Sequence, residues 1–430
     1  ASVDRNREIY RQVYAEHGKH PAARVVRNDL QVKELENGDI FVVSELTVTN
    51  RASVVIPLVI YLNPGLTVNR LDIDGQPVSF RKDHQALITG KELNLRETCK
   101  VLIRYEGGIE NDLCFLDTPP GAYTCPTVNG IGIYRFGYSP AFCGKKYKLL
   151  TPECIWYPVC VPPYGESGIR VVNFSRYSLR VEHDPRLMAI SQGDRIEKEK
   201  GETEFAFAHD MPGISLCVGD YNERTVLLDS TRVSFYFHPA HEYLLEEYDI
   251  IPEDTLPKRL LRKKENLENE ECIQTSEFIK KYYIEKYYYK RGQDVSDPTQ
   301  QYPYRWGILV EVPVDFYCFP HVMQRTGERV QGGIVFLPEK AYSIKAYPFK
   351  VPNVIEEEEK VDYISNIRLA NDIETFIGKG GCSIRPMLQG KTISIISREY
   401  PILQDVLSDI SRKNRGTVSW TYPAEDCVAV

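Results

Sequence analysis

The stretch IFVVSELTV, residues 40–48, predicts a β-strand with one buried face. Its apolar side chains fall on alternate positions, at Ile40, Val42, Leu46 and Val48. Because successive side chains of a strand point to opposite faces of a sheet, this period of two places one row in the core. Asn37 and Gly38, just before the stretch, tolerate the positive φ of a tight turn. We therefore predict a hairpin that belongs to an antiparallel β domain.

The same period continues outward along the chain. A second turn, Asp74-Gly75, separates two short strands at 71–73 and 78–80. Further strands are predicted at 54–62, 100–105, 177–181, 204–207, 214–218 and 233–237. These segments indicate an antiparallel β-sandwich or saddle that spans residues 19–240.

Three other regions break this pattern. Residues 1–18 predict an amphipathic helix that Ser2 caps and Gly18 ends. Residues 109–165 are rich in Gly, Pro, Tyr and Cys and predict an irregular insertion in the β domain. Residues 241–430 combine helical and strand patterns, so the fold class is α+β, with a mixed α/β domain after the β domain.

Composition argues against nucleic acid as a partner and against a membrane-spanning segment within these residues. The net charge is −7 at pH 7, so the basic footprint of a nucleic-acid-binding protein is missing. No stretch has the roughly 20 consecutive apolar residues that span a bilayer. A loop domain excised from between membrane helices would have the same composition, and attachment to a membrane would then use segments outside these residues.

The eleven cysteines contain no CxxC pair, which argues against a zinc ribbon. We predict that most are buried or free thiols, because an unpaired cysteine behaves as a small hydrophobic residue. A disulfide in the loop-rich segment stays open as an alternative. Its candidates are Cys114, Cys125, Cys143, Cys154 and Cys160.

Several motifs occur in an order typical of a known enzyme family. They are LLTPE at 149–153, WYP at 156–158, VGDY at 218–221, YPY at 302–304, VEVPVDF at 310–316 and IVFLPE at 334–339. In this order they resemble the front portion of the aminopeptidase N (gluzincin) family. The resemblance covers most of residues 20–340 and implies an incomplete gluzincin catalytic domain after a β saddle. The most similar variant is the extracytoplasmic domain of bacterial proteins that fuse an ABC-transporter permease to an aminopeptidase-like module.

Two departures from that family argue against peptidase activity. The string HExxH, which places two zinc-binding imidazoles on one helical face, does not occur in the 430 residues. The family's GAMEN loop, which holds the substrate amine, corresponds to RTGERVQGG at 325–333. Glu328 in this loop is read as a solvated acid, although it could replace the amine-binding carboxylate.

Two other motifs contain residue types that bind metals or phosphate. HPAHE at 238–242 groups two histidines and a glutamate, but Pro239 prevents a shared helical face, so we predict a polar turn. GKGG at 378–381 lacks the spacing of a phosphate-binding loop, so a flexible turn is favoured. The sequence therefore predicts no metal, no cofactor and no catalytic residue.

The main functional hypothesis is a non-catalytic extracytoplasmic domain of a permease-like membrane protein. Its expected partners are a peptide or protein ligand, or subunits of its own transporter. The alternative is the N-terminal portion of an active zinc aminopeptidase whose HExxH motif lies outside this chain, and a carbohydrate-binding or envelope-structure module is a weaker third possibility. Candidate groove residues are acids at or beside strand ends: Glu311, Asp315, Glu328 and Glu339.

Overall fold

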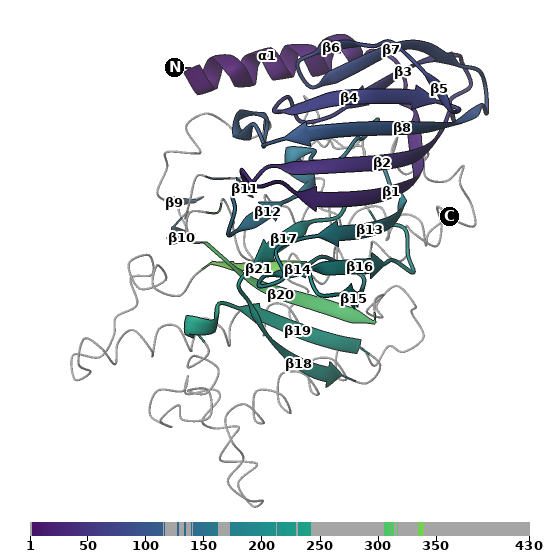
Figure 1. The fold of residues 1–430 in the computed structure, drawn as a ribbon. Helices are drawn as coiled ribbons and strands as arrows, with labels where there is room; N and C mark the ends of the chain where they lie inside the picture. Colours follow the sequence, from purple (N-terminus) through teal and green to yellow (C-terminus); the bar gives the residue numbers. More distant parts are fainter. Residues whose placement is uncertain are drawn as a thin grey trace, which may run out of the picture.

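The computed structural model describes residues 2–114, 116, 127–128, 133–134, 139, 141–161, 173–211, 213–228, 231–241, 305–313, 316 and 334–338. Within these ranges most of the chain forms β-strands in five sheets, and one α-helix precedes them (Figure 1). The predicted α+β class with a β-rich first part is confirmed. The predicted helices after residue 241 and the GKGG segment lie outside the described residues. None of the helices described here is long and apolar enough to cross a membrane.

The largest sheet has eight strands in the order β15-β16-β13-β1-β2-β8-β4-β5. Its strands are β15 (Asp194–Glu199), β16 (Glu202–Ala206), β13 (Arg176–Glu182), β1 (Arg24–Glu34), β2 (Ile40–Thr49), β8 (Thr98–Gly107), β4 (Leu66–Ile73) and β5 (Gln76–Pro77). All neighbours are antiparallel except β1 and β13, which run parallel with Leu30 opposite Leu179. This parallel pair joins two halves of the sheet that come from distant parts of the sequence.

Strand β2 has the predicted alternation. Ile40, Val42, Ser44, Leu46 and Val48 are buried, and the residues between them are partly exposed or exposed. The predicted turn at Asp74-Gly75 is also confirmed, with φ of 50° and 79° at the two residues. The strand predicted after it at 78–80 is wrong. The strand pairing covers Gln76–Pro77 instead, and the Val78 N–H just beyond it donates to the Leu71 carbonyl at 2.9 Å.

A smaller sheet joins β3 (Ile56–Tyr61), β7 (Ala86–Leu93) and β6 (Arg81–Asp83), and helix α1 (Ser2–His17) lies beside it (Figure 1). The helix buries Tyr10, Val13 and Tyr14 against a separate apolar cluster. The predicted end at Gly18 is confirmed, since Gly18 N–H donates to the Tyr14 carbonyl at 2.8 Å. A side chain at this glycine would lie 2.6 Å from that oxygen, so the position favours glycine.

A third sheet takes two of its four strands from the segment predicted to be an irregular insertion. It contains β11 (Phe142–Cys143), β12 (Lys148–Leu150), β17 (Leu216–Gly219) and β14 (Met188–Ile190). Residues 141–161 supply two of these strands, and Trp156 and Tyr157 just after them are almost fully buried. They are therefore part of the core. A hairpin of β9 (Thr127–Val128) and β10 (Ile133–Tyr134) is also described within 109–165.

The fourth sheet has the order β18-β19-β20-β21. Its strands are β18 (Asn222–Leu228), β19 (Thr231–Phe237), β20 (Trp306–Val312) and β21 (Ile334–Pro338). The strands predicted near 306–312 and 333–337 are confirmed. Strands on both sides of residue 240 share this sheet, and one apolar cluster extends from Ala23 to Phe336. The division of the chain into domains at residues 18 and 240 stays a prediction.

The cysteines that the structure describes are free thiols. Cys143 is partly exposed. The other five are buried, namely Cys99, Cys114, Cys154, Cys160 and Cys217. The prediction of buried, free thiols is confirmed for these residues, and the alternative of a disulfide among Cys114, Cys143, Cys154 and Cys160 is wrong. Cys125 lies outside the described residues.

Candidate functional site

Glu311 is the one predicted groove residue that falls within the described ranges. It lies near the end of β20 and is partly exposed. Its carboxylate Oε2 accepts a hydrogen bond from the backbone N–H of His238 at 2.8 Å. Its backbone carbonyl accepts one from the Tyr221 hydroxyl at 2.6 Å. Asp315, Glu328 and Glu339 lie outside the described residues.

The Tyr221 hydroxyl connects the third and fourth sheets. Tyr221 lies between β17 and β18, and its oxygen is 3.3 Å from the Tyr147 hydroxyl and 3.4 Å from the Cys217 sulfur. One hydroxyl carries one proton, so we assign it to the short bond with Glu311. Burial raises the pKa of Tyr147 and Tyr221 well above its ordinary value. Both groups are therefore neutral hydroxyls that hold the sheets together.

Glu223, on β18, is a second acid at this junction and is also held by protein donors. Its Oε1 accepts hydrogen bonds from Ser234 at 2.7 Å, Tyr236 at 3.1 Å and Thr225 at 3.1 Å. Burial alone would raise the pKa of Glu223, but these bonds and the charge of Arg195 outweigh burial and lower the pKa. The carboxylate is thus ionised at neutral pH, and a general base that must take up a proton would need the opposite environment.

Several of the thiols are poor nucleophiles. Burial raises the pKa of Cys99, Cys143 and Cys217 to about 11 and that of Cys160 to about 12. The thiolate is the reactive form of cysteine, and it is scarce at neutral pH for groups with such values. These cysteines are therefore interpreted as packing residues.

The described part of the HPAHE segment, residues 238–241, forms a turn, as predicted. Residues Pro239–His241 make one turn of 3-10 helix directly after β19. His238 is exposed, and its Nδ1 accepts the N–H of Ala240 at 3.2 Å. This bond turns the ring nitrogen back onto the local backbone. Glu242 lies outside the described residues.

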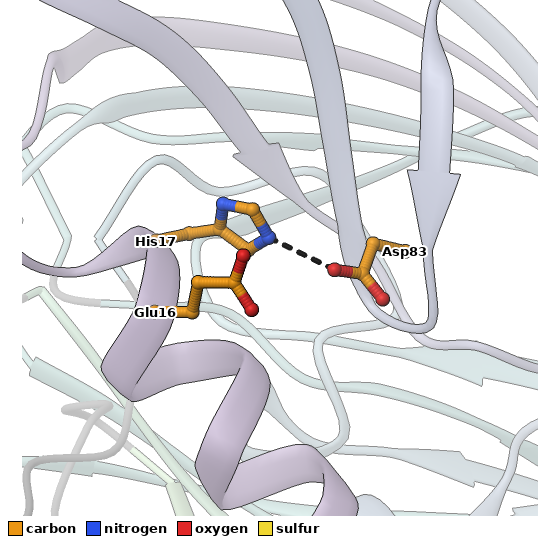
Figure 2. A group of neighbouring side chains, drawn as sticks. All are labelled: Glu16, His17 and Asp83. Carbon is orange, nitrogen blue, oxygen red and sulfur yellow. Dashed lines mark hydrogen bonds and ion pairs between the residues drawn. The ribbon is translucent and has the colours of Figure 1, made fainter.

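A second polar group lies at the other end of the molecule, where α1 meets β6 (Figures 1 and 2). Figure 2 shows Glu16 and His17, at the end of α1, beside Asp83, at the end of β6. His17 Nε2 lies 3.0 Å from Asp83 Oδ2, and His84 Nδ1 lies 3.0 Å from Asp83 Oδ1. The hydrogen bond with His17, and a second with His84, lower the pKa of Asp83 despite its partial burial.

The ligand atoms of Glu16, His17 and Asp83 lie within 4.8 Å of one another. In the part of the chain that the structure describes, this is the one such group of potential metal ligands. Sequence reasoning missed it, because 66 residues separate His17 from Asp83. No local spacing could have indicated that these residues meet.

Comparisons with known proteins give fold similarities only. No protein-family model and no curated protein matches the sequence. A variant of an M1 zinc metallopeptidase from Deinococcus radiodurans is 16% identical, with a TM-score of 0.41, over 74% of this chain and 60% of that chain. The M1 zinc metallopeptidase from the same organism is 14% identical, with a TM-score of 0.44, over 90% of this chain and 74% of that chain.

Legionella pneumophila aminopeptidase A in complex with aspartic acid is 14% identical, with a TM-score of 0.44. The alignment covers 91% of this chain and 40% of that chain. The chain thus spans less than two thirds of the length of the first of these structures and of the last. At these values the similarity assigns no activity or ligand to the chain.

Proposed function

We propose that this chain is a non-catalytic, extracytoplasmic binding domain of a permease-like membrane protein. In this proposal it binds a peptide, a protein or its own transporter. The observation that carries it is a contradiction within the sequence. The motifs that resemble the aminopeptidase N family occur in order, yet HExxH is missing from the 430 residues. Without two imidazoles and an acid at that spacing, the family's way of activating water is not available from these residues.

The hydrogen bonds at the sheet junction support this reading. Glu311 and Glu223 both accept bonds from protein donors, and the lowered pKa of Glu223 keeps it ionised. Carboxylates in such surroundings position backbone and side chains and do not exchange protons near neutral pH. His238 is exposed directly beside Glu311, so the shared end of strands β19 and β20 is where we place the contact with a ligand.

The location outside the cytoplasm and the attachment to a membrane follow from the resemblance alone. Acidic net charge supports the choice of a protein or peptide partner over nucleic acid. The alternative function is the N-terminal portion of an active zinc aminopeptidase. Reading the parent gene on both sides of these residues separates the two. Flanking membrane segments favour the first proposal, and an HExxH motif favours the second.

A peptidase assay on the purified chain tests the lack of catalysis. The chain is incubated with zinc and a panel of short peptides, and free amino acids are measured. We expect no release above that of a heat-denatured sample. Release of amino acids together with stoichiometric zinc binding would overturn the proposal.

Photo-crosslinking in native membranes tests the binding role. A photoreactive residue replaces the exposed His238 in the full-length protein, and Leu95, exposed in the β7–β8 connection, serves as the control position. We expect a specific crosslinked product from position 238 and none from position 95. We also expect reagents that reach only the extracytoplasmic side to label this domain of the full-length protein. Equal crosslinking at both positions, or labelling only from the cytoplasmic side, contradicts the proposal.

A further inference from the structure

The cluster at the end of α1 brings three metal-binding side chains together from two separate elements. Glu16 and His17 come from the last turn of the helix, and Asp83 comes from β6 (Figure 2). We propose that Glu16, His17 and Asp83 form a binding site for a divalent transition metal ion, with zinc as the best match. This site is independent of the function proposed above.

The distances agree with tetrahedral coordination. Zinc binds imidazole nitrogen and carboxylate oxygen at about 2.0 Å, which places neighbouring ligand atoms about 3.3 Å apart. His17 Nε2 and Asp83 Oδ2 are already 3.0 Å apart. The Glu16 ligand atom lies within 4.8 Å of both. Because Glu16 is exposed, its side chain can rotate by the remaining distance without disturbing the core.

The donor types select the kind of ion. Imidazole suits zinc, copper, iron and nickel, whereas magnesium and calcium prefer sites made only of oxygen. Two carboxylates balance the charge of a divalent cation when the imidazole is neutral. Three protein ligands leave one position of a tetrahedral ion for water or another group.

Two features of the surroundings favour a cation, whereas the Arg81 guanidinium, 3.9 Å from Asp83 Oδ2, opposes one. The other oxygen of Asp83 accepts a hydrogen bond from His84 at 3.0 Å, which fixes the orientation of the carboxylate. Glu16 and His17 lie at the C-terminal end of α1, where the helix dipole stabilises positive charge. His17 and Asp83 are only 12% and 20% exposed, so both ligands are shielded from solvent but can still be reached.

A bound ion would join α1 to the three-stranded sheet. The helix otherwise contacts this sheet through the apolar side chains of Tyr10, Val13 and Tyr14. The competing interpretation is a simple ion pair between His17 and Asp83, in which Glu16 has no part. The two interpretations differ in whether zinc binds and whether Glu16 contributes.

Isothermal titration of the whole chain with zinc chloride, after removal of bound metal and under reducing conditions, tests the proposal. We expect one saturable site that His17→Ala and Asp83→Asn each weaken by at least tenfold, as is usual for changes around a metal site. Glu16→Gln should weaken zinc binding by a smaller factor. His20→Ala is the matched control, because His20 is exposed and lies just beyond the helix. Absence of saturable binding, or unchanged affinity in both His17→Ala and Asp83→Asn, would overturn the proposal.

Two further measurements guard against misfolding and against binding by cysteine. Zinc should raise the melting temperature of the unmodified chain and of His20→Ala but not that of Asp83→Asn, a variant that keeps the shape of the side chain. Cobalt in place of zinc should give a spectrum without a thiolate charge-transfer band. A strong thiolate band, or an equal thermal shift in Asp83→Asn, places the ion elsewhere and contradicts the proposal.

Discussion

The polar side chains around Glu311 and those around Asp83 differ in what surrounds them. At the sheet junction, Tyr221 is buried and Glu311 and Glu223 have protein donors at 2.7 to 2.8 Å. At the helix end, Glu16 is exposed, and its carboxylate lies within 4.8 Å of the ligand atoms of His17 and Asp83. Polar groups that satisfy one another hold a structure together, whereas convergent groups open to solvent can accept an ion.

The largest effect is expected where a charge is most deeply buried in the sheets. Lys148, on β12, is 1% exposed and its Nζ lies 2.5 Å from Glu34 Oε1. Lys148→Met leaves the Glu34 carboxylate without its cation, so the free energy of unfolding should fall by about 3–5 kcal/mol. Chemical denaturation of the variant measures this loss.

An exposed ion pair between β1, the strand of Glu34, and β13 provides the control for Lys148. Lys33 and Glu182 lie 2.9 Å apart but are 60% and 53% exposed. Lys33→Met should therefore cost less than about 1 kcal/mol. Equal losses in the two variants would show that burial does not set the strength of these pairs.

The second prediction concerns the hydroxyl between the sheets. Tyr221→Phe removes the hydroxyl that donates to the Glu311 carbonyl, which should cost about 1–3 kcal/mol. Tyr147→Phe removes a hydroxyl that bonds to side chains only, so its cost should be smaller. Thermal unfolding of both variants checks the order, and a larger loss in Tyr147→Phe would contradict it.

The third prediction is a pH dependence. The pKa of Glu223 is lower in the folded chain than the value of about 4.3 in an unfolded chain. Its ionised form thus stabilises the fold above about pH 4.3, and this contribution is lost as the pH falls through the lower folded pKa. Glu223→Gln should remove that part of the pH profile, with a smaller effect than Tyr221→Phe. Parallel profiles for the variant and the unmodified chain would refute the assignment.

The smallest effect is expected at the helix end in the absence of metal. His17 and Asp83 are both partly exposed, so Asp83→Asn should lower the free energy of unfolding by less than about 1 kcal/mol. Adding zinc should widen this difference, since only the unmodified chain gains stability from the ion. If zinc does not change the difference in free energy of unfolding between the two chains, Asp83 has a structural role, as Glu223 does, and binds no ion.

Sequence patterns predicted where strands lie better than which strands pair with each other. The alternation at Ile40 and Val42 identified β2, because one face of that strand is buried. The pairing of β1 with β13 could not be predicted, because it depends on residues about 150 positions apart. The short strand at Lys148 was missed for a different reason: it is buried along its whole length and has no alternation.

The candidate sites show the same division. The polar turn after β19 was predicted, since Pro239 determines the local backbone. Glu311 was identified by a motif, but its bonds to His238 and Tyr221 were not, because they join separate elements. His17 and Asp83 meet only after α1 packs on the three-stranded sheet.

The parallel pair β1 and β13 has a consequence for synthesis on the ribosome. Leu30 of β1 can find Leu179 only after the intervening residues have left the exit tunnel. Until then β1 has one free edge, which is an open template for pairing with another chain. Pairing over so long a separation is slow, and the nascent chain is therefore most exposed to aggregation in the interval before β13 emerges.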